Sequence, residues 1–152
     1  MSSEGKTEWV VVGIDGSPES AHALEWAARY AKAIGAGIRV VTAWHYPAAV
    51  GAAPVGVAPA GVSADVEEAK QAELDQAIRE TFGEAPTIPV EKKIAYGHAA
   101  QVLIDESKDA DLLVVGSRGH GAFTGMLLGS VSTHCVTHAT CPVLVVRPTP
   151  ER

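Results

Sequence analysis

A group of glycines and serines in the last third of the chain has residue types and a spacing that could bind an anion. Gly116 and Gly119 follow an apolar run, and Gly129 stands directly before Ser130, with Ser132 close behind. Glycine can adopt positive φ and lets a backbone approach a ligand, while serines at a helix start add hydroxyl groups to the free N–H groups there. Because such N–H groups attract anions, the spacing predicts a phosphate-binding loop.

Two familiar nucleotide-binding motifs do not fit the chain. Gly5-Lys6-Thr7 lacks the upstream glycine and the preceding strand of a P-loop. The glycine fingerprint of dinucleotide-binding proteins is missing after the first apolar run, so we expect neither a nicotinamide nor a flavin cofactor. Several donors can still hold a polyphosphate, since charge-assisted hydrogen bonds contribute about 1.5–3 kcal/mol each.

Four residues near the C-terminus superficially resemble a set of metal ligands, namely His134, Cys135, His138 and Cys141. The two histidines have helical i, i+4 spacing, but Cys135 lies a quarter-turn from His134 on a helix and Cys141 precedes a strand. One tetrahedral site is hard to assemble from them, so we predict no metal ligand and two free, mostly buried thiols.

No catalytic residue is predicted. His98 and His120 could approach a γ-phosphate, but lone loop histidines are more often exposed polar side chains. The chain shows no nucleophile and base at a recognisable spacing, so we expect at most slow hydrolysis of a bound nucleotide.

The elements that must position these residues alternate along the chain. Apolar runs predict strands over Trp9–Ile14, Ile38–Trp44, Ile88–Ala95, Leu112–Val115 and Val143–Val146. Helical patterns lie between them, from Pro18 to about Gly35, over Asp65–Phe82, from about Ala99 to Ser107, and from Ser130 to about His138. This alternation predicts an α/β fold with a parallel five-stranded sheet and helices on both faces.

The first two helices carry apolar positions that predict their buried faces. In the first helix, which Ser17 is expected to cap, these positions are Ala21, Leu24, Ala28, Ala31 and Gly35. In the second helix they are Val66, Ala69, Leu74, Ala77, Ile78 and Phe82.

Asp15 follows the first strand and is expected to form a turn with Ser17. In parallel sheets, ligands lie beyond the carboxyl ends of the strands, where the winding direction reverses. With the strands in the order 3-2-1-4-5, the first and fourth strands are neighbours, and Asp15 faces the glycine loop across one crevice.

Composition restricts the class of protein. The 152 residues are 47% hydrophobic and suffice for one core, so we expect a single domain over 1–152, with a flexible tail at 1–7. A formal net charge of −6 argues against nucleic acid as a partner. The N-terminus shows no signal peptide and no run reaches the ~18 apolar residues of a membrane span, which predicts a cytoplasmic protein that does not insert in membranes.

The uncharged Ala/Gly/Pro-rich segment 46–62 is expected to be a flexible loop. Because it follows the second strand, our hypothesis is that it folds over the ligand pocket as a lid or packs on a partner chain.

The glycine spacing Gly116-x2-Gly119-x9-Gly129-Ser130 resembles the G-x2-G-x9-G-[ST] signature of the nucleotide-binding branch of the universal stress protein family. The resemblance extends through residues 11–17, 111–116 and 141–146 and covers almost the whole chain. It implies the adenine-nucleotide alpha-hydrolase-like (Rossmann-like) sandwich, with ATP and Mg²⁺ as ligands.

The resemblance also implies which residues bind the nucleotide. The adenosine group comprises Gly13, Ile14, Asp15, Ala43, Val115 and Gly116. The phosphate group comprises Arg118, Gly119, Gly129, Ser130, Val131 and Ser132. Within these groups the Asp15 carboxylate would lie near the ribose or a metal-bound phosphate, and the Ala43 backbone would meet the adenine edge. Arg118 stands where the loop of the family varies.

Val143–Val146 would be an apolar edge strand, which tends to pair with another chain. Members of the family dimerise through the last strand, so we expect a homodimer. The sequence thus favours an ATP-binding, nucleotide-responsive stress regulator. Two alternatives stay open: a dimeric interaction protein of the same fold that works without nucleotide, and a protein that binds AMP or cyclic AMP.

Overall fold

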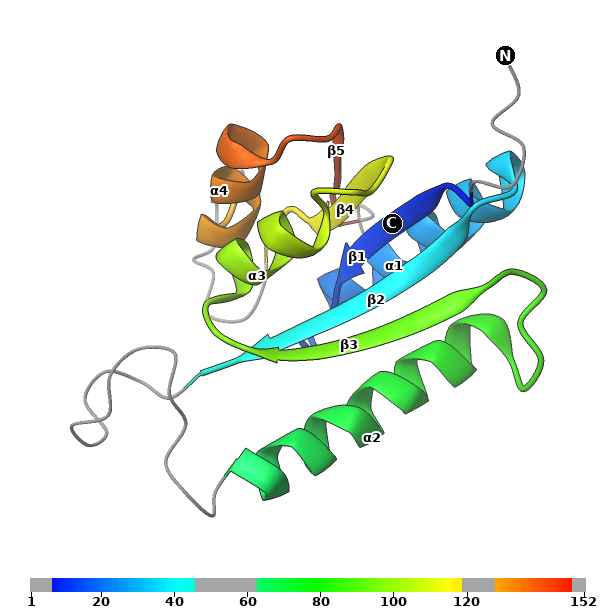
Figure 1. Ribbon diagram of the computed structural model, residues 1–152, viewed down its shortest axis with the longest axis horizontal. Coiled ribbons are helices and arrows are strands. Elements are labelled where there is room, and N and C mark those ends of the chain that lie inside the picture. The colour runs from blue at the N-terminus through cyan, green and yellow to red at the C-terminus, as the bar shows by residue number, and fades with distance from the viewer. Residues whose placement is uncertain (1–6, 46–62, 119–127, 149–152) are drawn as a thin grey trace.

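The computed structural model describes residues 7–45, 63–118 and 128–148 and contains one parallel five-stranded sheet in the order β3-β2-β1-β4-β5 (Figure 1). The strands are β1 (Trp9–Gly13), β2 (Gly37–Trp44), β3 (Val90–Tyr96), β4 (Leu112–Gly116) and β5 (Val143–Val146). The helices are α1 (Pro18–Ile34), α2 (Ser63–Phe82), α3 (Ala99–Glu106) and α4 (Ser130–His138). The predicted α/β fold and strand order are confirmed. Residues 1–6, the 46–62 segment, Gly119 and His120 lie outside the described residues.

β1 is the central strand and pairs with both β2 and β4. Val12 lies opposite Val40 on one side and Val114 on the other. β3 and β5 form the two edges of the sheet. The winding direction therefore reverses between β1 and β4, as expected, and the turns after these two strands are neighbours.

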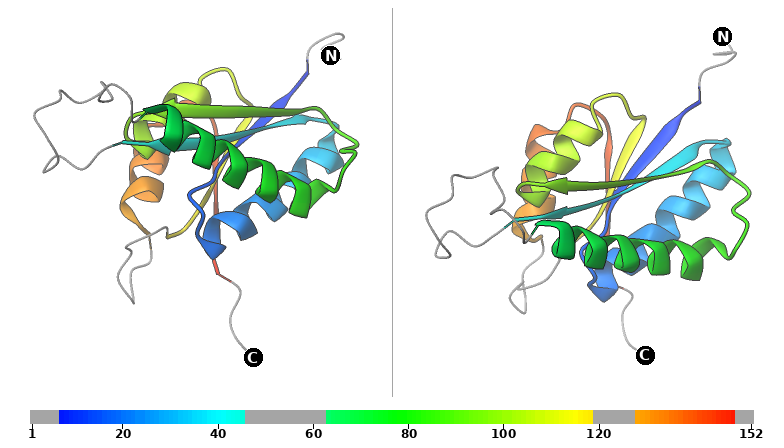
Figure 2. Two further views of the ribbon diagram at one scale, coloured as in Figure 1. Left: turned by 90° about the horizontal axis from the view of Figure 1, so that it is seen from below. Right: turned by 60° about the horizontal axis from the view of Figure 1, so that its bottom comes forward.

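Two apolar layers cover the sheet because its strands expose alternate residues to opposite faces. The layer under α1 and α2 contains Val10, Val12 and Leu24, and the layer under α3 and α4 contains Val11, Leu113 and Cys135. Figure 2 shows the two helix pairs on opposite sides of the sheet. Among the helices of the described ranges, none is long and apolar enough to cross a lipid bilayer.

The ends of α1 follow the sequence prediction. Ser17 caps the helix by accepting a hydrogen bond from the Ser20 N–H, and Pro18 occupies the first turn. Gly35 ends the helix with a φ of 71°, a left-handed conformation that favours glycine.

The predicted helix faces need correction at four positions. Ala21 and Gly35 are exposed, because the face of α1 that packs on the sheet is rotated toward Ser20, Ala23 and Ala27. In α2, Ala69 is exposed and Val66 only half-buried, since the helix packs on the core through its second half. The residues of α2 in that half are Leu74, Ala77, Ile78 and Phe82.

Candidate functional site

The turn after β1 is fastened to the carboxyl end of β2. The Ile14 N–H donates to the Val41 carbonyl at 2.8 Å, and the buried Thr42 Oγ donates to the Ile14 carbonyl at 2.8 Å. Ala43 is the second-last residue of β2 and is half-buried. The two positions predicted to meet an adenosine, the 13–15 turn and Ala43, therefore lie on adjoining strand ends.

Asp15 orders the start of α1. Its Oδ1 accepts hydrogen bonds from the Ser17 N–H at 2.9 Å and from Ser17 Oγ, while its own N–H donates to Ser20 Oγ at 3.3 Å. The predicted bond between Asp15 and Ser17 is thereby confirmed. A contact of the carboxylate with a ribose or a metal-bound phosphate stays a prediction.

Ser117 fastens the beginning of the glycine loop to the start of α4. Its N–H donates to the Val146 carbonyl at 2.9 Å, and its carbonyl accepts from the Gly129 N–H at 2.6 Å and from Ser132 Oγ at 2.9 Å. Ser117 and Ser132 are only 1% and 2% exposed. Residues 117, 129 and 132 thus form one buried clip, which we call the Ser117 clip.

Sequence reasoning missed three polar residues that shape the site: Ser20, Thr42 and Ser117. The spacing of glycines carries no signal for them, because the Ser20 and Thr42 hydroxyls bond to backbone groups and Ser117 acts through its own backbone. Ser132 was predicted, but its Oγ donates to the Ser117 and Gly129 carbonyls at 2.9 and 3.1 Å. With that proton in use, Ser132 offers a ligand its N–H group.

α4 begins as a helix with an open N-terminal turn. Gly129 is the N-cap residue with φ −79° and ψ 177° and has no side chain to cap the helix. The N–H groups of Ser130, Val131 and Ser132 have no carbonyl in a preceding helical turn to bond with. The exposed Ser130 side chain stands beside these groups, so this turn can receive an anion.

The expected positive φ at the loop glycines is not found at the two described positions. Gly116 and Gly129 both have ordinary φ values. Gly116 is instead required by close packing, because a Cβ there would lie 3.2 Å from the Glu19 carbonyl oxygen of α1. At Gly13, a Cβ would lie 2.8 Å from Leu103 Cδ1 of α3.

Two further predicted residues have buried side chains. Ile14 is 7% exposed and packs under α1 and α2, and Val115 is 3% exposed and packs under α3 and α4. Both would meet a ligand through backbone atoms. Arg118 is half-buried at the end of the described loop segment.

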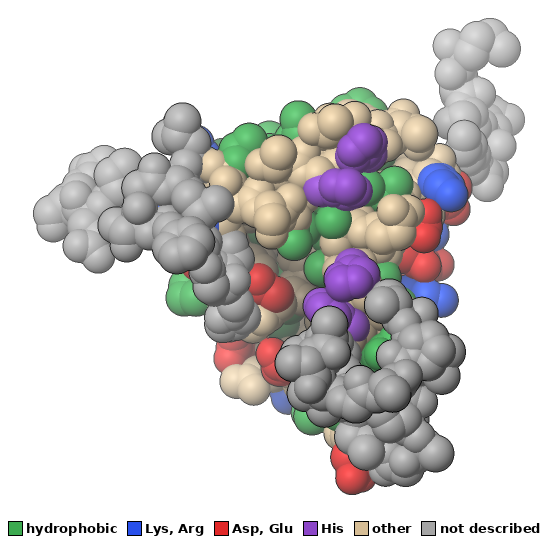
Figure 3. Space-filling model, turned by 90° about the vertical axis from the view of Figure 1, so that its left-hand side faces the viewer, with side chains coloured by type: hydrophobic (Ala, Val, Ile, Leu, Met, Phe, Trp, Pro, Cys, Tyr) green, Lys and Arg blue, Asp and Glu red, His purple; other side chains and the backbone are tan. Residues whose placement is uncertain are grey.

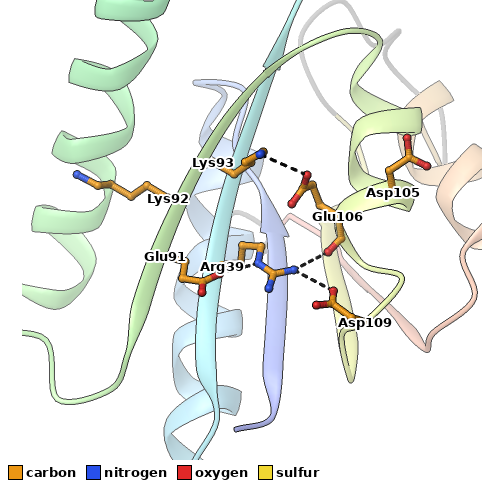
Figure 4. Close-up of a pocket in the computed structure, with 7 residues that line it drawn as sticks. All are labelled: Arg39, Glu91, Lys92, Lys93, Asp105, Glu106 and Asp109. Atoms are coloured by element: carbon orange, nitrogen blue, oxygen red, sulfur yellow. Dashed lines mark hydrogen bonds and ion pairs between the residues drawn. The ribbon is translucent and has the colours of Figure 1, made fainter.

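A charged pocket of about 430 Å³ lies between β2, β3 and α3, away from these strand ends (Figure 4). Arg39 Nε donates to Glu91 at 2.8 Å, and Nη1 donates to Asp109 at 3.1 Å and to the Glu106 carbonyl at 2.7 Å. Burial lowers the pKa of Arg39, but the bonds to Asp109 and Glu91 outweigh it and raise the pKa overall. Since Arg39 already has three partners, this pocket is a structural clamp and a poor ligand site.

Histidine side chains gather on the face that carries α4 and the carboxyl ends of β2 and β3 (Figure 3). They form two contacting pairs, each with ring centroids 4.4 Å apart: His45 with His98, and His134 with His138. His98 is exposed at the N-cap position of α3.

The two cysteines are free thiols, as predicted. Cys135 is fully buried, and burial, aided by the nearby Cys141, raises its pKa to about 11. Within the described ranges, no three His, Cys, Asp or Glu side chains gather in a way that could hold a metal ion.

A family model, a related sequence and two solved structures that match this chain all come from one family. The family model described as "Universal stress protein family" matches residues 7–147. A universal stress protein of Mycolicibacterium smegmatis is 39% identical over 143 residues, which are 91% of this chain and 45% of that protein. The chain therefore spans about half the length of the curated relatives it matches.

Solved structures share the fold. A universal stress protein in complex with cAMP has a TM-score of 0.70 and 28% identity, with 93% of this chain and 98% of that chain covered. The universal stress protein from Archaeoglobus fulgidus in complex with dAMP has a TM-score of 0.62 and 20% identity, with 93% and 98% covered.

Proposed function

Because the chain belongs to the universal stress protein family, we propose that it binds an adenine nucleotide beyond the carboxyl ends of β1, β2 and β4. We propose ATP as the preferred ligand, with Mg²⁺ on its phosphates. A structural neighbour at 28% identity is described as a complex with cAMP, which supports this class of ligand.

The observation that carries the proposal is the Ser117 clip. It fixes the open first turn of α4 beside the end of β4, so that the N–H groups of residues 130–132 converge with the Ser130 hydroxyl. Several aligned donors and the positive end of a helix suit a phosphate chain better than a single neutral group. Oxygen ligands suit Mg²⁺, and Asp15 supplies a carboxylate at the neighbouring turn.

We propose that the nucleotide acts as a regulatory ligand in a stress response and is hydrolysed slowly at most. Fast phosphoryl transfer requires a placed base and cationic groups around the transferred phosphate. Among the described residues, the site supplies N–H groups, hydroxyl groups, one carboxylate and the half-buried Arg118, a set that favours binding over rapid turnover.

Calorimetric titration tests the ligand. Purified protein, freed of any retained nucleotide, is titrated with ATP, ADP, AMP and cyclic AMP, with and without Mg²⁺. Tightest binding of ATP with Mg²⁺ is the expected result. Tighter binding of AMP or cyclic AMP would show that the preferred ligand is a nucleoside monophosphate and not ATP. If none of the four nucleotides bound, a dimeric interaction protein that works without nucleotide would be favoured.

Ser130→Ala tests the phosphate contact. Loss of one charge-assisted hydrogen bond is expected to weaken ATP binding by roughly 1–3 kcal/mol, or about 5- to 150-fold in Kd. Thr137→Ala is the matched control, because it also removes one exposed hydroxyl from α4. That hydroxyl donates to the Thr133 carbonyl of the same helix. Equal Kd values for both variants and the unaltered protein would remove Ser130 from the site.

A further inference from the structure

His134 and His138 lie one turn apart on the outer side of α4. Both side chains are exposed, their ring centroids are 4.4 Å apart, and their planes are inclined by 48°. Residues at i and i+4 share one face of a helix, so the two imidazoles converge in solvent.

The backbone under this pair is fixed. Thr137 Oγ donates to the Thr133 carbonyl at 2.9 Å, and the Ala139 N–H donates to the Cys135 carbonyl at 2.9 Å, so the last turn of α4 is hydrogen-bonded. The Cys135 side chain points into the core below and anchors the helix. Because the helix backbone is already ordered, binding of one ion by both imidazoles has to order only their side chains.

The chemistry of the donors selects the ion. Imidazole nitrogen suits Zn²⁺, Cu²⁺ and Ni²⁺, whereas Mg²⁺ and Ca²⁺ prefer oxygen ligands. The neighbouring thiols do not join the pair. Cys135 is fully buried, and Cys141 is half-buried before β5 with a pKa that burial also raises.

We propose that His134 and His138 form a two-imidazole chelating site for one divalent transition-metal ion, Zn²⁺, Ni²⁺ or Cu²⁺, on the outer face of α4. Water completes the coordination of the ion. The site differs from a four-residue tetrahedral set of His134, Cys135, His138 and Cys141, because both cysteines are outside it. The two histidines lie about 6 and 12 Å along the helix axis from Ser130, so the metal site is separate from the proposed nucleotide site.

Calorimetric titration of the full-length protein with NiCl₂, without nucleotide and after chelator treatment, tests the proposal. The unaltered protein is expected to bind one Ni²⁺ at this site and to show no comparable binding of MgCl₂. His134→Ala and His138→Ala should each raise the Kd for Ni²⁺ at least tenfold. Alanine favours an exposed helical position, so both variants should keep the fold, which circular dichroism checks.

Two controls make the test specific. His138→Ala combined with Val136→His keeps the number of histidines but places them at i and i+2, which do not face each other. Val136 is 50% exposed and accommodates the new side chain. The i, i+2 variant should bind Ni²⁺ as weakly as His138→Ala does. His45→Ala combined with His98→Ala removes the other ring pair and should leave the α4 site intact.

Thermal unfolding gives a second readout. Because chelation requires the folded helix, Ni²⁺ should raise the Tm of the unaltered protein in a concentration-dependent manner and leave that of His138→Ala much less changed. Unaltered Ni²⁺ affinity in His134→Ala and His138→Ala, or restored affinity in the i, i+2 variant, would overturn the proposal. The proposal would also be overturned if Ni²⁺ binding were lost only in the variant that combines His45→Ala with His98→Ala. None of these outcomes depends on whether the protein binds nucleotide.

Discussion

At the scale of single residues, Gly116 joins the end of β4 to the start of α1. A Cβ at this position would lie 3.2 Å from the Glu19 carbonyl oxygen and 3.3 Å from the Arg118 carbonyl oxygen. Both neighbours are backbone atoms, which cannot rotate out of the way as a side chain can. The glycine of the predicted phosphate loop therefore sets how closely the two sides of the proposed site approach each other.

Gly116→Ala is expected to lower the free energy of unfolding by about 1–3 kcal/mol, because backbone must shift to admit the methyl group. The same shift should weaken ATP binding. Urea denaturation and calorimetry measure the two effects.

Gly83→Ala is the control for Gly116→Ala. Gly83 has a φ of 75° with nothing within 4 Å of an added Cβ, so alanine there costs about 1–2 kcal/mol of backbone strain and should leave ATP binding unchanged. Normal ATP affinity in Gly116→Ala would contradict this role of the close packing.

At the scale of elements, the charged cluster around Arg39, which we call the Arg39 clamp, joins β2, β3 and the end of α3. The side of β2 and β3 that faces α3 carries Arg39, Glu91 and Lys93 in place of apolar side chains. Arg39 ties β2 to β3 through Glu91 and to the end of α3 through Asp109. Lys92 points away from this group and pairs with Asp75 of α2 at 2.7 Å (Figure 4).

Asp109→Asn tests the clamp through its pH dependence. The hydrogen bond from Arg39 lowers the pKa of Asp109 below its ordinary 3.8, so the charged carboxylate stabilises the fold above about pH 4. This contribution is lost as the pH falls through the lowered pKa. Because the side chain is 70% exposed, solvent screening limits the effect to about 0.2–1 kcal/mol at pH 7.

Chemical denaturation between pH 3 and pH 7 measures the difference between the unaltered protein and Asp109→Asn. Asp105→Asn is the control, since Asp105 pairs with Lys108 of the adjoining turn and not with Arg39. If the free energies of unfolding of the unaltered protein and Asp109→Asn differed by the same amount from pH 7 down to pH 3, the result would contradict the clamp.

Elements were predictable from the sequence because their signals are local. Ser17 and Pro18 mark the start of α1 and Gly35 marks its end, and the apolar run at Leu112–Val115 is buried on both faces. The Arg39 clamp was not predictable, because its partners lie 52 and 70 residues away and depend on how strands and helix meet. The same limit explains why the glycine spacing did not predict the Ser117 clip.

At the scale of the whole molecule, the two edges of the sheet differ. The carbonyls of Pro142 and Val146 accept hydrogen bonds from Leu113 of β4 and from Ser117 directly after β4. The alternation of a strand therefore turns the backbone groups of Val143 and Val145 to the open side. β5 is apolar and lies at this edge, as predicted. We propose that a second copy of the chain pairs with it to form a homodimer.

Val145→Pro is expected to dissociate the dimer, because proline removes an N–H that faces the open edge and spares the bonds to β4. The dissociation constant should rise at least tenfold in sedimentation equilibrium. Val145→Thr keeps the N–H and nearly the same side-chain volume, and it should remain dimeric. A monomeric mass for the unaltered protein at micromolar concentration would contradict the interface.

The pairing of β1 with β4 also has a consequence for folding during synthesis on the ribosome. The Trp9 N–H donates to Asp111 across 102 residues of chain, so the central strand lacks one neighbour until β4 has left the ribosome. At 5–20 residues per second, synthesis of that stretch takes about 5–20 s. During this interval β1 exposes Val10, Val11 and Val12 beside an unpaired strand edge, and the nascent chain is then most dependent on chaperones.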